Sequence, residues 1–95
     1  ANVGAALECG VRQFDASLAG LGGCPFAPGA TGNIVMDDLC FMLDSMGLRT
    51  GVDLELLLQV RNIVRESLPD IAMQGALARA GLPRNYVRAE ARRAA

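Results

Sequence analysis

Cys24 is the residue that most suggests chemistry, because it lies in a segment that can be neither helix nor regular strand. Between positions 19 and 33 the sequence contains five glycines and two prolines. Such a segment is too long for a minimal helix–strand connection, and long loops in compact domains are usually either functional or disordered. The central thiol favours a functional loop. The alternative is an exposed cysteine without a role.

Oxygen-bearing side chains flank this segment. Asn33 directly precedes a predicted helix, so its side chain could cap that helix or give its amide oxygen to a hard cation. Asp37 and Asp38 fall in the first helical turn, and we interpret them as partners of the helix dipole rather than as metal ligands. Asp15 and Ser17 share one face of a predicted strand. Either an active-site role or plain hydrogen bonding fits them equally well.

Composition removes several classes of function. The sequence has no His, nine Arg as its only basic residues and a formal net charge of -1, which gives no long-range field for nucleic acid or an anionic membrane. No stretch is long and apolar enough for a transmembrane helix. The three cysteines, Cys9, Cys24 and Cys40, lack CxxC spacing, so we expect neither a disulfide framework nor a zinc cluster, and a reducing cytoplasm fits best. Cys9 and Cys40 fall in helical patterns and are interpreted as small packing residues.

The elements that must position these residues follow an α/β rhythm. Residues 1–10 favour a helix that ends at Gly10. Residues 11–17 alternate in polarity, which predicts a short strand. Its two faces carry Phe14, Ala16 and Leu18 on one side and Gln13, Asp15 and Ser17 on the other. Because a lone buried strand leaves its backbone groups unpaired, the sequence predicts that a partner sheet is missing.

Two amphipathic helices follow, at 34–47 and 53–68. Gly47 closes the first, while Asp53 is placed to cap the second and Val52 to pack on Leu57. The predicted inward stripe of the first helix is Val35, Leu39, Met42, Leu43 and Met46. That of the second is Leu57, Val60, Val64 and Leu68, widened by Leu56 and Ile63. A short helix is expected within 73–82, and the tail after Pro83 is expected to be loose.

The stretch 15–33 closely resembles the signature of hydroxymethylglutaryl-CoA lyases. Its most specific part is the Gly-Gly-Cys-Pro run at 22–25, followed by Gly32-Asn33. The resemblance covers roughly residues 1–65. Beyond the signature it continues through Asp38-Leu39, Met42-Leu43, Met46-Gly47, Thr50-Gly51-Val52-Asp53-Leu54 and Leu57-Leu58.

The resemblance implies that this chain is the C-terminal part of a (β/α)8 TIM barrel of the pyruvate carboxyltransferase-like type. On that basis 1–10 ends the seventh helix, 11–17 is the eighth strand and 18–33 is the catalytic loop at the C-terminal mouth of the barrel. Residues 34–47 form the eighth helix, 53–68 a C-terminal helix and 69–95 a tail. The first residues, which read as the middle of a helix, fit a chain that is cut at its front.

The activity implied by the resemblance is a retro-Claisen cleavage of an acyl-CoA substrate assisted by Mg or Mn. Cys24 would protonate the enolate of acetyl-CoA, and Asn33 would give its amide oxygen to the metal. The loop glycines, Gly20, Gly22, Gly23, Gly29 and Gly32, would give the loop freedom to close over substrate. Their spacing matches neither a dinucleotide fingerprint nor a Walker loop.

The resemblance also implies groups that this sequence lacks. A His-x-His pair, an Asp ligand, a catalytic arginine and most of the CoA groove would all lie upstream of Ala1. We therefore expect the isolated chain to be inactive, and the parent protein to be a homodimer. Met36 and Asp37 replace the usual Thr and Glu, which should tune the helix start without changing the reaction.

Three alternatives accompany this interpretation. Related lyases cleave citramalyl-CoA or longer branched hydroxyglutaryl-CoA analogues. Enzymes similar to 2-isopropylmalate synthase carry Gly-Glu-Arg-Ala-Gly-Asn where this chain has the different run 27–33, and they lack the cysteine, which argues against them. The third alternative is a non-enzymatic fragment that packs on a partner through its apolar helix stripes.

Overall fold

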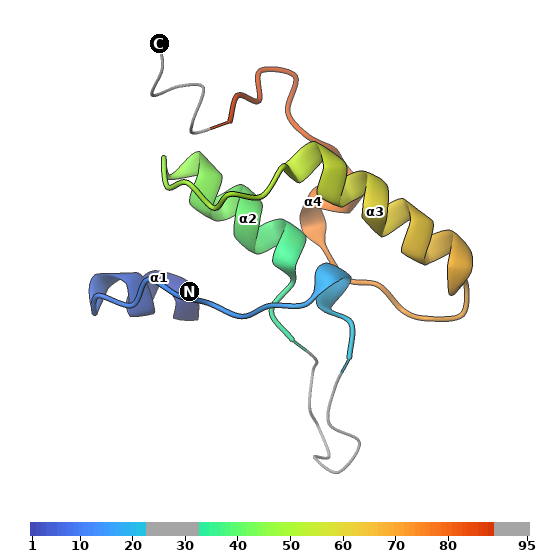
Figure 1. Cartoon of the computed structure of the whole chain (residues 1–95), viewed down its shortest axis with the longest axis horizontal. Coiled ribbons are helices and arrows are strands. Elements are labelled where there is room, and N and C mark those ends of the chain that lie inside the picture. The colour runs from blue at the N-terminus through green and yellow to red at the C-terminus, as the bar shows by residue number, and fades with distance from the viewer. Residues whose placement is uncertain (23–32, 89–95) are drawn as a thin grey trace.

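The computed structural model describes residues 1–22 and 33–88 and builds them mainly from helices (Figure 1). The elements are α1 (Asn2–Glu8), the 3-10 turn η1 (Leu18–Gly20), α2 (Met36–Ser45), α3 (Leu54–Ser67) and α4 (Ala76–Ala80). Helix α2 is central, because it packs against η1, α3 and α4. Across these two ranges, none of the helices has the length and hydrophobicity needed to cross a membrane.

The predicted helix ends are confirmed where glycine was expected to form them. Gly10, with φ 95°, follows α1, and the bonds Gly10 N to Leu7 O and Val11 N to Ala6 O close its last turn. Gly47, with φ 84°, does the same after α2. The predicted cap of α3 is also present, since Asp53 Oδ1 accepts the backbone N–H of Leu56 at 3.2 Å.

The predicted strand at 11–17 is not formed. Residues 11–16 have no regular secondary structure, and Ser17 makes only a single parallel bridge to Val35. The expected alternation nevertheless survives in the side chains: Phe14 and Ala16 are half-buried, whereas Gln13 and Asp15 are exposed. The segment therefore has the polarity of a strand and lacks, among the described residues, a neighbour that could pair with it.

The segment predicted as a continuous loop starts with an ordered turn. Gly20 N donates to Ser17 O at 2.9 Å and Leu21 N to Leu18 O at 3.0 Å, which forms η1. The same Ser17 receives the N–H of Met36 at 2.8 Å and donates its own to Ile34 O at 2.9 Å. These bonds bring residues 17–21 beside residues 33–36, at the start of α2.

Helix α2 buries more polar groups than the apolar stripe predicts. Its buried residues are Asp37, Leu39, Cys40 and Asp44. Leu39 was expected inside and is buried, but Met46 is 56% exposed. Cys40 joins Leu54 and Leu77 in a small core shared by α2, α3 and α4. The face that carries Asp37, Cys40 and Asp44 was missed because two of its members are acidic.

The inward face of α3 is also rotated from the predicted one. Val60, Ile63 and Leu68 are 46%, 62% and 49% exposed, and Leu56 is exposed as well. The buried residues are Leu54 and Arg61, with Leu57, Leu58 and Val64 half-buried beside them. The prediction therefore holds for Leu57 and Val64 and is wrong for the other members of the stripe, because an arginine lies in the middle of the true inward face.

The C-terminal segment is more ordered than expected. Helix α4 confirms the predicted short helix in a narrower range. After Pro83, Tyr86 N donates to Pro83 O at 3.0 Å, and the ring of Tyr86 lies 6.2 Å from that of Phe41 on α2. The expectation of a loose tail is therefore wrong up to Arg88.

Candidate functional site

Most of the predicted loop residues cannot be placed. Cys24, Gly23, Gly29 and Gly32 lie outside the described residues. The predicted site residues that the structure does place are Asn33, Gly20 and Gly22, and it brings all three together beside η1. The candidate site is therefore the pair of segments from which the glycine-rich loop leaves and to which it returns.

Asn33 is not a helix cap. The residue at the N-cap position of α2 is Val35, and no side chain caps this end. Asn33 instead donates from Nδ2 to the backbone oxygen of Leu21 at 2.8 Å, and its side chain is exposed. A carbonyl can only accept, so the amide nitrogen must face Leu21. This orientation leaves Oδ1, the atom that a hard cation prefers, on the other side of the amide.

The two described loop glycines allow this close approach. Gly20 and Gly22 have φ of 69° and 91°, a region that favours glycine. A Cβ at Gly22 would lie 3.2 Å from Asn33 Nδ2, and one at Gly20 would lie 3.2 Å from Val35 Cγ2. Side chains at these positions would therefore crowd the contact between the two segments.

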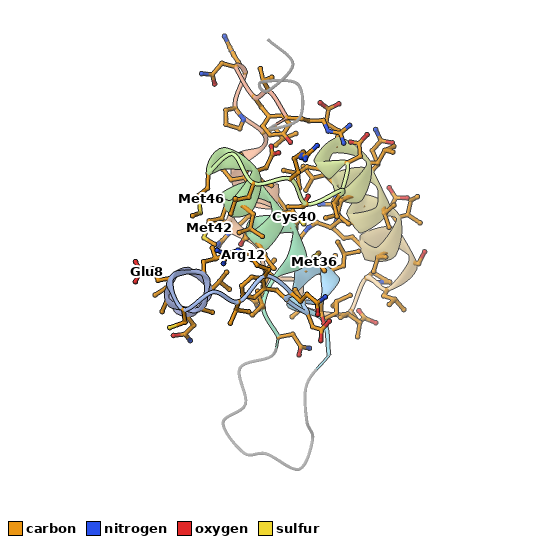
Figure 2. The ribbon with its side chains drawn as sticks, turned by 60° about the vertical axis from the view of Figure 1, so that its left-hand side comes forward. Glu8, Arg12, Met36, Cys40, Met42 and Met46 are labelled. Atoms are coloured by element: carbon orange, nitrogen blue, oxygen red, sulfur yellow. The ribbon has the colours of Figure 1, made fainter. Side chains whose placement is uncertain are left out.

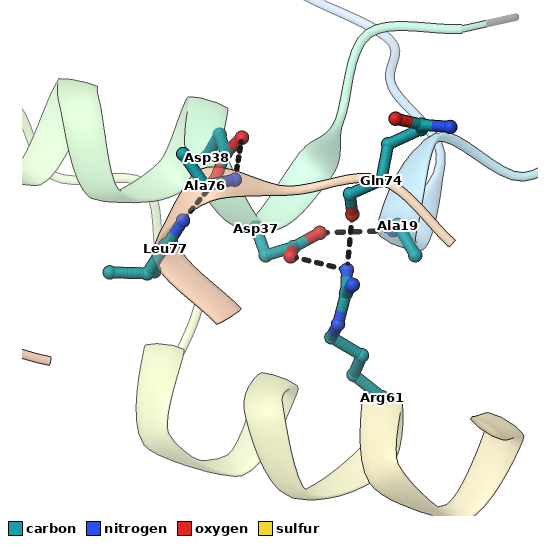
Figure 3. A network of polar contacts seen from close by, with 7 residues as sticks. All are labelled: Ala19, Asp37, Asp38, Arg61, Gln74, Ala76 and Leu77. Carbon is teal, nitrogen blue, oxygen red and sulfur yellow. Dashed lines mark hydrogen bonds and ion pairs between the residues drawn. The ribbon is translucent and has the colours of Figure 1, made fainter. Parts of the chain in front are cut away.

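Ala19 lies between the strand-like segment and Gly20 and has an unusual conformation. It is fully buried, and its φ of 56° is the only positive value among the non-glycine residues that the structure describes. Its N–H donates to Asp37 Oδ1 at 3.0 Å (Figure 3), and its oxygen accepts the N–H of Gln74 at 2.8 Å. Groups from α2 and from the segment before α4 therefore hold this residue from both sides.

Asp37 is more than a partner of the helix dipole. Its carboxylate is 0% exposed and accepts Arg61 Nη1 at 2.8 Å through Oδ2. The same Nη1 donates to Gln74 O at 2.6 Å. Removing one partner of a buried ion pair commonly costs about 3–5 kcal/mol, because the other charge is left without compensation. The pair therefore fixes α2, α3 and the segment before α4 in one arrangement.

Gly75 allows the backbone to pass close to this pair. It has φ of 138°, and a Cβ there would lie 2.9 Å from Asp37 Oδ2 and 3.1 Å from Arg61 Nη1. Beyond it, Asp38 accepts the N–H groups of Ala76 and Leu77, each at 3.0 Å. Asp38 thus caps α4, a role that its place in the first turn of α2 did not suggest.

The two described cysteines differ sharply. Cys9 is exposed, so the expectation that it packs in a core is wrong. Cys40 is buried, as expected, and its Sγ lies 3.6 Å from Met36 Sδ, one helical turn earlier on α2 (Figure 2). Burial raises the pKa of the Cys40 thiol, and the nearby Asp37 carboxylate raises it further. Cys40 therefore stays a neutral thiol.

A groove of about 450 Å³ lies between the N-terminal segment, α2 and residues 48–52. It is lined mainly by apolar side chains of the N-terminal segment and α2, among them Leu7, Phe14, Leu39 and Leu43. Figure 2 shows Met36, Cys40 and Met42 following one another along this helix. Of the predicted site residues that the structure describes, Gly20, Gly22 and Asn33 do not line the groove, so it is separate from the contact of Asn33 with Leu21.

Within the described ranges, no cluster of three or more His, Cys, Asp or Glu could hold a metal ion. Asn33 can contribute one neutral oxygen, which fits a single position in the coordination of Mg or Mn. It cannot make a binding site by itself. Any cation bound at Asn33 therefore needs further ligands from outside these residues.

The residues that shape the site most directly, Ala19, Asp37, Arg61 and Gln74, were not identified from the sequence. One signal was available. In the stripe formed by Leu54, Leu57, Leu58 and Val64, the missing position is occupied by Arg61, and a charge in such a stripe requires a buried partner. The carboxylates of α2 are the natural candidates.

Comparison with known proteins places this geometry in context. A sequence model of the HMGL-like family matches residues 1–64. The chain is 60% identical over 60 residues to the hydroxymethylglutaryl-CoA lyase of Pseudomonas mevalonii, which covers 63% of the chain and 20% of that protein. It is 48% identical over 68 residues to the human mitochondrial hydroxymethylglutaryl-CoA lyase, covering 72% of the chain and 21% of that protein.

Solved structures that resemble this chain are also HMG-CoA lyases. An HMG-CoA lyase from Acinetobacter baumannii, in complex with coenzyme A and 3-methylmalate, superposes with a TM-score of 0.81 at 45% identity. It covers 90% of this chain, which corresponds to 28% of the neighbour. The HMG-CoA lyase of Bacillus subtilis gives a TM-score of 0.73 at 37% identity, covering 83% and 26% of the two chains. The chain thus spans about a fifth of the length of the curated relatives it matches.

Proposed function

Because this chain belongs to the HMGL-like family, we propose that it forms part of an acyl-CoA lyase that cleaves 3-hydroxy-3-methylglutaryl-CoA into acetyl-CoA and acetoacetate. In the complete protein it would supply the last strand, the catalytic loop and the last helix of a (β/α)8 barrel. The alternation of residues 11–17, which have no pairing strand among the described residues, supports this place at a barrel wall.

The observation that carries the proposal is the orientation of Asn33. Its N–H group is used by Leu21 O at 2.8 Å, and its oxygen is left for a ligand. This oxygen is neutral and exposed, and it is of the type that hard cations accept as a ligand. Asn33 would therefore hold one position of a Mg or Mn ion, whose remaining ligands come from other parts of the barrel.

Asn33 would hold one position of the cation, which when bound would polarise the hydroxyl and carboxylate oxygens of the substrate. Asn33 stays fixed through its bond to Leu21, so its oxygen does not have to be reoriented during the reaction. A base from the rest of the barrel takes the proton of the substrate hydroxyl, whose oxygen becomes the ketone oxygen of acetoacetate. The electron pair of the broken carbon–carbon bond passes to the enolate of acetyl-CoA. Cys24 gives its proton to the carbon of that enolate, which completes acetyl-CoA.

Measuring the metal requirement of the full-length protein after substitution of Asn33 tests this function. Asn33→Ala should raise the Mg or Mn concentration needed for half-maximal acetoacetate release by more than about tenfold. Asn33→Asp keeps an oxygen ligand but cannot donate to Leu21, so its metal requirement should lie between those of wild type and Asn33→Ala. Asn62→Ala, at an exposed position of α3, is the matched control.

An unchanged metal requirement in Asn33→Ala, together with a lower melting temperature, would reduce Asn33 to a structural tie. The same assay should be run with citramalyl-CoA and with a longer branched hydroxyglutaryl-CoA. Faster cleavage of either would keep the lyase chemistry and the metal role but replace the proposed substrate. No cleavage of any of the three by wild type would refute the proposed function.

A further inference from the structure

We propose that Arg61 is a positioning residue for the start of the glycine-rich loop, acting through Asp37 on the backbone of Ala19. The inference rests on the lyase function proposed above, because the contact that Ala19 supports is the one that orients Asn33. Arg61 does not touch this contact itself. It lies one layer behind, on α3 (Figure 3).

The backbone of Ala19 is strained. An alanine with φ of 56° is unfavourable and persists only where its surroundings determine it strongly. Two bonds do so: Asp37 Oδ1 takes the N–H at 3.0 Å, and Gln74 N–H binds the oxygen at 2.8 Å. Without both, the chain at Ala19 is expected to relax to a more ordinary conformation and to redirect Gly20 and Leu21.

Both bonds at Ala19 depend on one guanidinium. Asp37 has no exposed surface, so its charge needs a buried partner, and Arg61 Nη1 supplies it at 2.8 Å. The same nitrogen binds Gln74 O at 2.6 Å, which fixes the residue whose N–H holds Ala19. Loss of Arg61 would therefore loosen the two supports of Ala19 together.

Ala19 is linked in turn to the proposed metal ligand. Leu21, which follows Gly20, accepts the amide N–H of Asn33 at 2.8 Å. Gly20 is packed tightly here, since a Cβ on it would lie 3.4 Å from Asn33 O. A shift at Ala19 would therefore move the carbonyl that orients Asn33. Groups that orient a metal ligand commonly change metal affinity or activity by about 10–100-fold when they are removed.

A purely structural role is the competing explanation. The cluster of Cys40, Leu54 and Leu77 already joins α2, α3 and α4 without the ion pair. Destabilising that cluster should weaken the protein without reaching Ala19. Leu54→Ala is therefore a variant with lost stability but an intact clamp, since Leu54 is 1% exposed and belongs to the cluster.

The experiment compares Arg61→Met, Arg61→Lys, Leu54→Ala and the exposed control Arg65→Met in the full-length protein. Arg61→Met should raise the metal requirement for acetoacetate release by about 10–100-fold, with the KM for the acyl-CoA changed only a few-fold. Hydrogen–deuterium exchange of a peptide containing Ala19 should become faster. Arg61→Lys keeps the charge but not the planar donor group, so it should restore part of both properties. Arg65→Met should behave as wild type.

Gly75→Ala gives a second route that leaves the arginine in place. Its Cβ would lie 2.9 Å from Asp37 Oδ2, so it should push the pair apart and change metal requirement and exchange in the same direction as Arg61→Met. If Arg61→Met does not fold, Gly75→Ala and Arg61→Lys decide the question.

The proposal is overturned if the Arg61 and Gly75 variants lose thermal stability but keep the wild-type metal requirement and Ala19 exchange, or if Leu54→Ala changes both as strongly. Failure of the lyase function gives a different result. Wild type would then release no acetoacetate, while the exchange at Ala19 would still show whether Arg61 holds the loop root.

Discussion

Single cysteines in this chain have different surroundings and should therefore react differently. Cys9 is exposed, whereas Cys40 is buried in the core cluster and kept neutral by its raised pKa. Because the thiolate is the reactive form, alkylating agents should modify Cys40 slowly while the protein is folded. Because Cys9 is exposed, its modification should not disturb the packing of the core.

Cys24 is predicted to be the thiol on which activity depends. In the full-length protein, Cys24→Ala should lower kcat by about 10²–10⁴-fold with a KM within a few-fold of wild type, because a positioned proton donor is lost. Cys9→Ala should change neither stability nor turnover, and Cys40→Ala should lower stability alone. Alkylation should inactivate wild type, and mass spectrometry should locate the substrate-protected label on Cys24. Near-normal kcat in Cys24→Ala would refute the proposed acid.

Tyr86 is the chain's only tyrosine and titrates unusually. Burial, followed by a hydrogen bond with Asp44, raises its pKa to about 12. The folded pKa is thus above the unfolded value of about 10, so the stability due to the neutral phenol is complete below about pH 10 and is lost as pH rises toward 12. Between about pH 10 and 12, the free energy of unfolding of the full-length protein, measured with denaturant, should fall more steeply in wild type than in Tyr86→Phe. Equal slopes would contradict the shift.

At the scale of elements, α4 depends on a cap that comes from another helix. Asp38 on α2 accepts the N–H groups of Ala76 and Leu77. In the full-length protein, Asp38→Ala should lower the free energy of unfolding by about 0.5–2 kcal/mol, as loss of a helix cap commonly does. Asp38→Asn keeps one accepting oxygen, so its free energy of unfolding should lie between those of wild type and Asp38→Ala. Exchange of the Ala76 and Leu77 amides measures the effect directly, and the exposed Asp70→Ala is the control. Unchanged exchange would show that α4 needs no such cap.

How far the sequence predicted these elements depended on whether their signals were local. Gly10, Gly47 and Asp53 marked helix ends correctly, because caps and glycine turns are decided by neighbouring residues. The inward faces of α2 and α3 were predicted less well. Asp37 and Arg61 occupy those faces because each neutralises the other across 24 positions of sequence. The local stripe of α3 indicates that Arg61 needs a buried partner but does not say which residue that partner is.

In the candidate site, too, some features could be expected from the sequence and others could not. The approach of Gly20 and Gly22 to Asn33 was not predicted, but the backbone freedom of these two residues could be expected because they are glycines. The clamp on Ala19 could not, because an alanine carries no sign of a positive φ. The roles of Asn33 as a metal ligand and of Cys24 as a proton donor remain predictions.

For the whole molecule, the main feature is how much apolar surface is left uncovered. Ten large hydrophobic side chains are exposed among the residues that the structure describes, and the radius of gyration of 14.4 Å exceeds the value of about 12.4 Å expected for a compact chain of this length. The exposed residues are Val11, Ile34, Met46, Leu48, Leu56, Val60, Ile63, Leu68, Ile71 and Val87. Surfaces of this kind usually meet another part of a protein.

We therefore predict that the 95-residue chain alone is inactive and lacks a cooperative monomeric unfolding transition, since small cores seldom supply more than a few kcal/mol. Calorimetry and the titration of Tyr86 both test this. In a largely unfolded chain the tyrosine should ionise near its ordinary value of about 10 instead of about 12. A sharp transition in a monomer, or acetoacetate release by the chain alone, would show that the prediction is wrong.

The cap that Asp38 provides has a consequence for the order of folding. Helix α4 has five residues, fewer than an isolated helix needs to be stable in water, and its cap lies 38 positions earlier in the chain. Residues 76–80 can therefore become helical only after α2 has formed and the intervening chain has closed. Synthesis proceeds from the N-terminus, so the ribosome releases α2 before the segment that depends on it. The direction of translation thus matches the order in which these two helices can assemble.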